Sequence, residues 1–178
     1  MPPAIERLRA VDVEHELSGL VAILRDAVDD GASVGFLPPL GEAEAAEYWR
    51  DVGTAVADGS RVLLVARVAD RGLVGTVQLD LAMRPNGRHR AEVAKLMVHR
   101  AARRRGLGRA LMLAIQVAAR RLGRTTLVLD TRAGDPSERL YVALGYQRAG
   151  LIPRYTAGTD GTLHTTALYY RLLDDHEG

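Results

Sequence analysis

The sequence predicts an α/β protein built on a mixed sheet, and the order of its apolar segments supports this. Three extended segments follow one another at residues 61–69, 73–82 and 91–98. A helix, a strand and a short helix then alternate before two last extended segments close the chain. Consecutive strands followed by alternating helices and strands are typical of a sheet that mixes parallel and antiparallel pairs. A length of 178 residues fits one domain.

The N-terminal third is predicted to be helical. Apolar residues recur at helical spacing over 11–29, and Asp30-Gly31 ends that pattern. The segment 32–41 contains two consecutive prolines, which exclude a helix interior and a central strand, so it is expected to be a loop. A second helix is predicted over 42–56.

The two strands that follow are expected to pair as a hairpin through the turn at 70–72. The first is almost continuously apolar, which indicates burial on both faces. The second alternates, with Gln78 and Asp80 on the face opposite its valine and leucines.

The C-terminal part is predicted to contain a strand at 125–131, a short helix within 134–145, and extended segments at 146–154 and 163–173 joined by a turn at 159–162. A solvated tail is expected at 174–178.

Composition limits the class of protein. There is no cysteine, so neither a disulfide framework nor a thiol nucleophile is expected. No apolar run approaches the roughly 18 residues of a membrane span, and residues 1–7 lack the order of a signal peptide. We therefore expect a cytoplasmic protein without a membrane partner, and its richness in arginine and alanine suggests a bacterial source.

A basic, glycine-containing loop at 103–108 separates the strand at 91–98 from an amphipathic helix over 107–122. Glycines let backbone N–H groups approach an anion at a helix N-terminus, and arginines add charge-assisted hydrogen bonds. The loop lacks the Lys-Ser/Thr of a Walker A motif, and Leu111 stands where a dinucleotide fingerprint needs glycine. The pattern predicts a different kind of phosphate-binding loop.

Nucleic acid is the alternative partner for this basic segment. The net charge is only +2, and the chain has one Phe and one Trp, so platforms for base stacking are scarce. A phosphate-bearing cofactor is the favoured interpretation, and no nucleic-acid partner is expected.

Two motifs resemble those of the GNAT (Gcn5-related) N-acetyltransferases. Arg103-Arg-Arg-Gly-Leu-Gly108 resembles the family's pyrophosphate loop, and Leu140-Tyr-Val-Ala-Leu-Gly-Tyr146 resembles its closing signature. The resemblance, nearest to tabtoxin-resistance-type enzymes for small molecules, implies a mixed sheet of about six or seven strands flanked by about four helices. It further implies one domain over 1–178, with a helical acceptor-side region at 1–60 and a core at 61–173.

The resemblance also implies acetyl-CoA as cosubstrate and a set of residues that hold it. The backbone of Leu96, Met97 and Val98 is expected to bind the pantetheine arm. The pyrophosphate is expected to lie against Arg103, Arg104, Arg105, Gly106, Leu107, Gly108, Arg109 and Ala110. Gly134 stands where the family often has asparagine, and Ser137 where it has a small residue; both are expected near the cofactor.

Acetyl transfer to an amine needs a base and a proton donor for the departing thiolate. The resemblance places Tyr141 as the donor and Glu92 as the base, against the alternatives of a packing tyrosine and a surface glutamate. His99 and His164 are further candidates for the base. No metal site is expected, because metal-binding spacing is absent, and no nucleophile elbow is present.

The predicted reaction is direct acetyl transfer to the primary amine of a small molecule. Phe36 and Trp49 are candidates for contact with that acceptor, although both also suit a hydrophobic core. A protein N-terminal or lysine acetyltransferase and a non-catalytic acyl-CoA-binding module stay open, as do a monomer and a homodimer.

Overall fold

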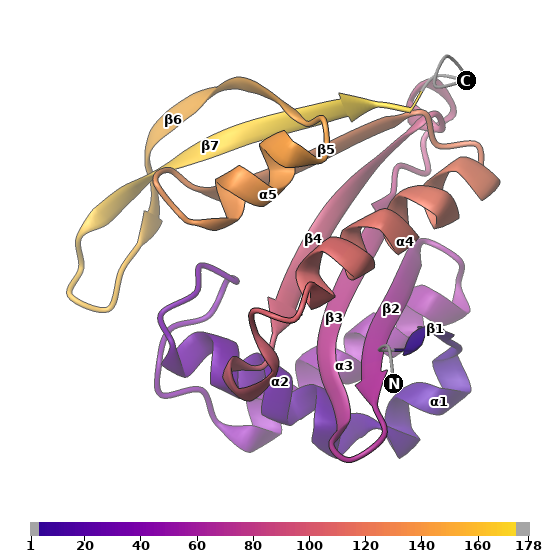
Figure 1. Cartoon of the computed structure of the whole chain (residues 1–178), viewed down its shortest axis with the longest axis vertical. Helices are drawn as coiled ribbons and strands as arrows, with labels where there is room; N and C mark the ends of the chain where they lie inside the picture. The colour runs from indigo at the N-terminus through magenta and orange to yellow at the C-terminus, as the bar shows by residue number, and fades with distance from the viewer. Residues whose placement is uncertain (1–3, 174–178) are drawn as a thin grey trace.

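The computed structural model describes residues 4–173, which form one seven-stranded sheet (Figure 1). The strand order is β1-β2-β3-β4-β5-β7-β6, and every neighbouring pair is antiparallel except β4 with β5. This confirms the predicted mixed α/β sheet. The strands are β1 Ala4–Leu8, β2 Arg61–Val68, β3 Gly72–Leu81, β4 Arg90–Val98, β5 Thr126–Arg132, β6 Gln147–Ala157 and β7 Leu163–Leu172.

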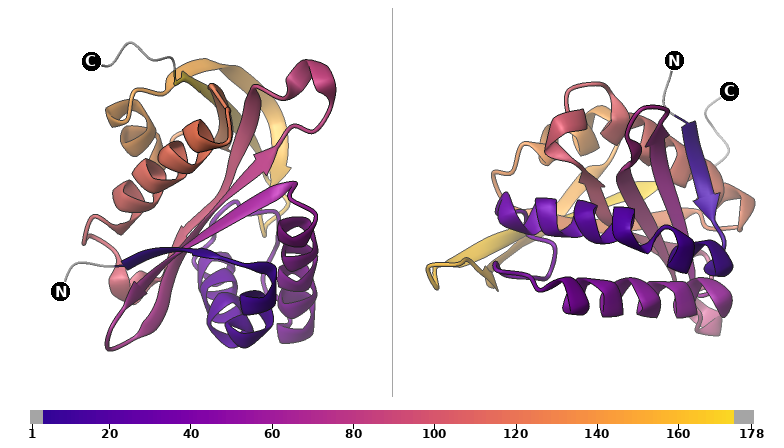
Figure 2. Two further views of the ribbon diagram at one scale, coloured as in Figure 1. Left: turned by 90° about the vertical axis from the view of Figure 1, so that its right-hand side faces the viewer. Right: turned by 90° about the horizontal axis from the view of Figure 1, so that it is seen from below.

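Helices cover both faces of the sheet, as the two views of Figure 2 show. Helices α1, α2 and α3 lie on one face, and α4 and α5 lie on the other. The helices are α1 Ala10–His15, α2 Leu17–Asp29, α3 Glu42–Ala57, α4 Leu107–Arg121 and α5 Ser137–Ala143. Strand β2 feeds both cores: Val62 packs on the α4 side and Leu63 on the α2–α3 side. The predicted burial of β2 on both faces is confirmed.

The N-terminal region differs from its prediction in two ways. The single helix expected over 11–29 is two helices, because Glu16 has φ −96° and ψ 5° and interrupts the helical backbone. An additional strand, β1, pairs antiparallel with β2 from Ala4 to Leu8. Because this edge strand has only five residues and contains Glu6 and Arg7, its sequence carries little strand signal.

The polar face of β3 is covered by α3. Gln78 is buried and exchanges hydrogen bonds with the Tyr48 hydroxyl, at 2.9 and 3.2 Å. The predicted alternation along β3 is confirmed, and its polar side faces a hydrogen-bonding partner.

The sheet divides between β4 and β5. These strands pair only from Arg90 to Glu92, with Glu92 opposite Val128, and then diverge (Figure 1). A bulge in β4 adds to the divergence: the β3–β4 register shifts between Thr76 and Gln78, and Lys95 has φ 52°. A bulge bends its strand and increases the local twist. The result is an opening in the middle of the sheet.

The C-terminal hairpin of β6 and β7 extends past the divided sheet. Strand β6 continues to Ala157, three residues beyond the expected 154, and pairs with β7 as far as Leu163. The tail predicted at 174–178 lies outside the described residues.

Candidate active site

A cavity of about 210 Å³ lies where β4 and β5 separate. Its walls come from β4, β5, α5 and the loop after α2, and both Glu92 and Tyr141 line it. Glu92 is on the last paired position of β4, and Tyr141 is on the helix that follows β5. The fold thus brings together the two residues predicted to be catalytic.

Tyr141 sits in an aromatic cluster at one wall of this cavity. Its side chain is 7% exposed, and its ring centroid lies 6.0 Å from that of Tyr146 and 6.1 Å from that of Tyr169. Burial raises the pKa of the Tyr141 phenol to about 12, although a hydrogen bond with Ser137 acts in the opposite direction. The hydroxyl is therefore protonated at neutral pH, as a proton donor requires.

Glu92 lines the cavity at the point where β4 and β5 separate. Desolvation raises the pKa of its carboxyl, and the negative charges of Asp80 and Asp130 act in the same direction. Asp80 is directly opposite Glu92 in the β3–β4 register. A raised pKa makes a carboxylate a stronger base near neutral pH.

The loop before α4 presents unpaired backbone donors. Arg104 and Gly106 have φ 62° and φ 75°, so the chain turns sharply into the helix. The first helical hydrogen bond is donated by the Ala110 N–H to the Gly106 carbonyl at 3.0 Å. Within residues 4–173, the N–H groups of 104–109 have no acceptor outside that helix. Such a row of N–H groups at a helix N-terminus suits an anion.

The arginines of this loop are not equivalent. Arg103 lies in the protein's own network: its Nε donates to the Val98 carbonyl at 3.0 Å, and its Nη1 is 2.6 Å from Asp30. Arg104, Arg105 and Arg109 are exposed and form no ion pair with the described part of the chain. Arg104, Arg105 and Arg109 therefore carry guanidinium groups without an ion-pair partner in the described residues, while Arg103 attaches the loop to the end of α2.

The segment Leu96, Met97 and Val98 borders the gap in the sheet. Its backbone pairs with β3 on one side, but β4 has no strand partner on the other side beyond Glu92. The Val98 carbonyl already accepts from Arg103, and the other alternate backbone groups along this edge are available to an extended ligand. Met97 itself is buried, so any contact from that residue would be through the main chain.

Gly134 and Ser137 lie at the start of α5. The Gly134 N–H donates to Glu138 Oε1 at 2.5 Å, and the other oxygen of Glu138 accepts from the Tyr169 hydroxyl. The Ser137 hydroxyl lies 3.1 Å from that of Thr131. Ser137 lines the cavity, whereas the Gly134 N–H is used to close the loop.

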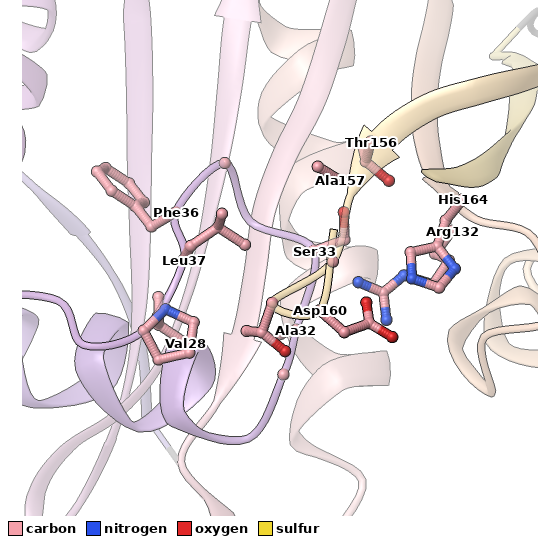
Figure 3. Close-up of a pocket in the computed structure, with 15 residues that line it drawn as sticks. Val28, Ala32, Ser33, Phe36, Leu37, Arg132, Thr156, Ala157, Asp160 and His164 are labelled. Carbon is pink, nitrogen blue, oxygen red and sulfur yellow. The ribbon is translucent and has the colours of Figure 1, made fainter. Parts of the chain in front are cut away.

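A second, larger cavity of about 510 Å³ adjoins the first (Figure 3). It lies between the loop after α2 and the β6–β7 turn, and it shares Ala32 and Ser33 with the smaller cavity. Phe36, a predicted candidate for contact with the acceptor, lines this cavity. Trp49 is 0% exposed within the core and lines no cavity described for residues 4–173, which fits the alternative of a core aromatic.

The two histidines considered as bases lie apart. His164 lines the larger cavity, but not the one that contains Tyr141. His99 lies at the end of β4, where its Nδ1 accepts from the Ala101 N–H at 3.3 Å and its Nε2 is 3.6 Å from Asp26. Neither histidine lines the smaller cavity, whereas Glu92 does.

The comparison with protein families now decides the class. The family model described as "Acetyltransferase (GNAT) family" matches residues 21–146. The chain belongs to this family. Membership makes it an acyltransferase, and the match spans most of α2, all of α3, the strands β2 to β5 and the loop before α4.

Solved GNAT structures have the same fold over nearly the whole chain. A phosphinothricin acetyltransferase from Sinorhizobium meliloti, in complex with acetyl-CoA, is 23% identical with a TM-score of 0.78, covering 99% of this chain and 91% of that one. A ribosomal-protein-alanine N-acetyltransferase from Brucella melitensis is 24% identical with a TM-score of 0.78, covering 96% and 99%. A putative acetyltransferase from Salmonella typhimurium, with acetyl-CoA, is 19% identical with a TM-score of 0.78, covering 100% and 98%.

Several lining residues of this GNAT chain were not predicted from the sequence, and two of them are cationic. Arg132 ends β5 and lines the larger cavity, and Lys95 stands on the β4 bulge and lines the smaller one. Burial lowers the pKa of the Lys95 ammonium. The polar run Asp130-Thr-Arg132 at the end of an apolar strand was a sequence signal that could have identified Arg132. No sequence signal marked the bulge that carries Lys95.

Two further properties concern the whole described region. No helix within 4–173 is both long and apolar enough to cross a membrane. In the same residues, no three His, Asp or Glu side chains gather in the manner of a metal site.

Proposed function

We propose that this chain transfers the acetyl group of acetyl-CoA to the primary amine of a small molecule by direct attack. The observation that carries the proposal is that Glu92 and Tyr141 line one cavity at the divided sheet. One group suits the removal of a proton from the amine, and the other suits the donation of a proton to a thiolate. Family membership and the two structures described with acetyl-CoA support the cosubstrate.

The residues present fit acetyl-CoA along a continuous path. The free N–H groups of 104–109 and the exposed Arg104, Arg105 and Arg109 suit a diphosphate. The unpaired edge of β4 leads from this loop to the small cavity. An extended amide-containing arm can add to such an edge by main-chain hydrogen bonds. The thioester would then lie beside Tyr141.

The proposed chemistry uses only groups of this chain and its two substrates. The Glu92 carboxylate takes a proton from the ammonium of the acceptor, and the free amine attacks the thioester carbonyl. The carbon–sulfur bond breaks, and the Tyr141 hydroxyl protonates the departing thiolate. A backbone N–H on the open edge of β4 can donate to the carbonyl oxygen as negative charge develops. The proton on Glu92 returns to solvent. The attacking nitrogen loses a second proton as the amide forms, and this proton passes through solvent to restore the Tyr141 hydroxyl.

The shape of the acceptor side supports a small molecule. The loop at 31–38 and the β6–β7 turn lie on opposite sides of the larger cavity and restrict it to about 510 Å³. This volume is in the range of about 300–1,000 Å³ typical of small-ligand pockets. It also adjoins the proposed reaction centre through Ala32 and Ser33.

A thiol-release assay on the full chain tests the proposal. Acetyl-CoA is combined with a panel of free amines and, separately, with peptides that carry a free N-terminus or a lysine. We expect thiol release with free amines and a mass increase of one acetyl group on the amine. Release with peptides alone would establish protein acetylation instead. Calorimetric binding of acetyl-CoA without turnover on any amine would establish a non-catalytic module.

A further inference from the structure

The larger cavity contains an arginine without a partner. Arg132 lies at the end of β5, and its Nε is buried without a hydrogen-bond partner among residues 4–173. The guanidinium forms no ion pair with the described residues either. A guanidinium that is partly withdrawn from water loses solvation, and an unpaired buried donor costs about 1–3 kcal/mol. Arg132 also lines the cavity, and its terminal nitrogens form no hydrogen bond among residues 4–173, so an acceptor group in the cavity can bind there.

The acidic residue in the same cavity does not supply that partner. Asp160 lines the cavity, but its Oδ1 accepts from the Thr162 N–H at 2.9 Å and its Oδ2 from the Thr162 hydroxyl at 2.8 Å. These hydrogen bonds lower the pKa of Asp160, so it stays negative within the β6–β7 turn. Its charge disfavours an anion that fills the whole cavity. A single compact anionic group at Arg132 is compatible with it.

A second cationic or donor group faces the same space. Figure 3 shows Arg132 and His164 extending from neighbouring strands toward the β6–β7 turn. Gly158 leaves room for the imidazole: a Cβ at that position would be 2.8 Å from His164 Nε2. An imidazole always carries at least one ring N–H, so His164 can donate to a ligand that lies in this cavity.

The position of this site relative to the proposed reaction centre indicates what it would hold. The larger cavity shares the lining residues Ala32 and Ser33 with the smaller one, which Glu92 and Tyr141 line. One molecule that spans both has its amine at Glu92 and its far end at Arg132. The planar guanidinium fork matches a carboxylate or similar oxyanion in a bidentate manner.

We propose that Arg132 is a specificity-determining residue that binds a compact oxyanion, with carboxylate as the simplest case, on the acceptor amine. The acceptor is then an amino acid-like molecule with its reacting amine and its anionic group at opposite ends. This inference rests on the proposed function, because it takes the smaller cavity as the place of acetyl transfer.

Matched pairs of acids and amides test the proposal. Glycine, β-alanine, 4-aminobutyrate and 5-aminovalerate are each compared with the corresponding amide, which keeps the shape and removes the charge. We expect kcat/KM to favour the acid by about 10- to 100-fold for at least one chain length, the range of a hydrogen bond to a charged group. Arg132→Gln abolishes that preference by lowering kcat/KM for the acid to the level of its amide. Arg120→Gln, at the exposed end of α4, retains the preference.

A binding measurement gives a readout that does not depend on turnover. The Nε–H resonance of Arg132, assigned by its absence in Arg132→Lys, is followed by NMR during titration with propionate and with propionamide. We expect it to shift with propionate only. A resonance that responds equally to both, or to neither, overturns the oxyanion site.

The two proposals fail in different ways. Turnover of amides as fast as acids, unaffected by Arg132→Gln, contradicts the oxyanion site while acetyl transfer stands. A propionate-specific shift in a protein that binds acetyl-CoA and acetylates no amine supports the oxyanion site and contradicts the proposed function.

Discussion

The Arg103 guanidinium lies 2.6 Å from the Asp30 carboxylate, which joins the loop before α4 to the end of α2. Both side chains are partly exposed, so this pair contributes only about 0–1 kcal/mol to stability. Its consequence is positional. The loop whose N–H groups 104–109 have no acceptor outside α4 in the described structure is attached to the helix that precedes the loop at 31–38.

Removing the charge of Asp30 therefore affects binding more than stability. For Asp30→Asn we expect the Kd of acetyl-CoA to rise about three- to tenfold, which corresponds to at most about 1.4 kcal/mol, while the melting temperature changes little. Calorimetry and thermal unfolding measure both. Asp29→Asn is the control: Asp29 is exposed, its side chain forms no hydrogen bond in the described structure, and its replacement should leave the Kd unchanged. Equal effects of the two variants would contradict the positional role.

Gly106 is required by the geometry of the loop. Its φ of 75° is in the left-handed region, and a Cβ there meets no atom within 4 Å, so Gly106→Ala introduces backbone strain of about 1–2 kcal/mol without a clash. Gly123, at the opposite end of α4, has φ 68° and equally open surroundings. We expect both alanine variants to lower the free energy of unfolding similarly in urea titrations. Only Gly106→Ala should also weaken acetyl-CoA binding, and a similar loss with Gly123→Ala would refute the proposed loop role.

The raised pKa of Glu92 predicts the direction of the pH dependence. The base acts as a carboxylate, so kcat falls as pH is lowered through the pKa of Glu92, and this occurs above the usual 4.5 of a glutamate. Tyr141, with a pKa of about 12, stays protonated across the same range and therefore causes no further change in kcat with pH. In Glu92→Gln the acidic limb disappears and kcat falls about 10²- to 10⁴-fold.

The exposed Glu44→Gln on α3 keeps the wild-type profile. Steady-state rates at saturating substrates, measured from acid to alkaline pH, provide the comparison. An unchanged acidic limb in Glu92→Gln would assign the base elsewhere.

Phe36 and Trp49 are expected to affect different properties, one the binding of the acceptor and the other the stability of the fold. Phe36 lines the larger cavity, so Phe36→Ala should raise the acceptor KM about tenfold, as expected for a loss of about 1.4 kcal/mol of apolar contact. Trp49 is wholly buried, so Trp49→Phe should lower the free energy of unfolding by about 0.5–3 kcal/mol. Its acceptor KM should stay that of the wild type. A rise in the acceptor KM for Trp49→Phe without a loss of stability would show that Trp49 contributes to the acceptor site.

Local patterns predicted the parts of the structure that depend on nearest neighbours. The loop 103–108 and the strands on either side of the 70–72 turn are clear from glycine placement and apolar periodicity. The break at Glu16 was not, because the apolar spacing continues through both helices while only the backbone angle changes. Periodicity reports which face is buried, and it is insensitive to a single non-helical residue.

The arrangement of the site depended on contacts between distant segments. The joint cavity of Glu92 and Tyr141 exists because β4 and β5 pair at only three positions, and no local pattern specifies that divergence. The same holds for the contact of Arg103 with Asp30, 73 residues away in sequence, which no local pattern specifies. Arg132 was hidden for the same reason, since the cavity it lines is completed by the β6–β7 turn.

The kcat of Tyr141→Phe, measured together with the Kd of acetyl-CoA, tests the proposed acetyl transfer most directly. Removing one hydroxyl at the shared cavity should lower kcat about 10²-fold or more while the calorimetric Kd stays within about twofold. The exposed Tyr155→Phe on β6 should change neither value. A Tyr141→Phe enzyme that turns over as fast as the wild type would contradict the assignment of the cavity as the reaction centre.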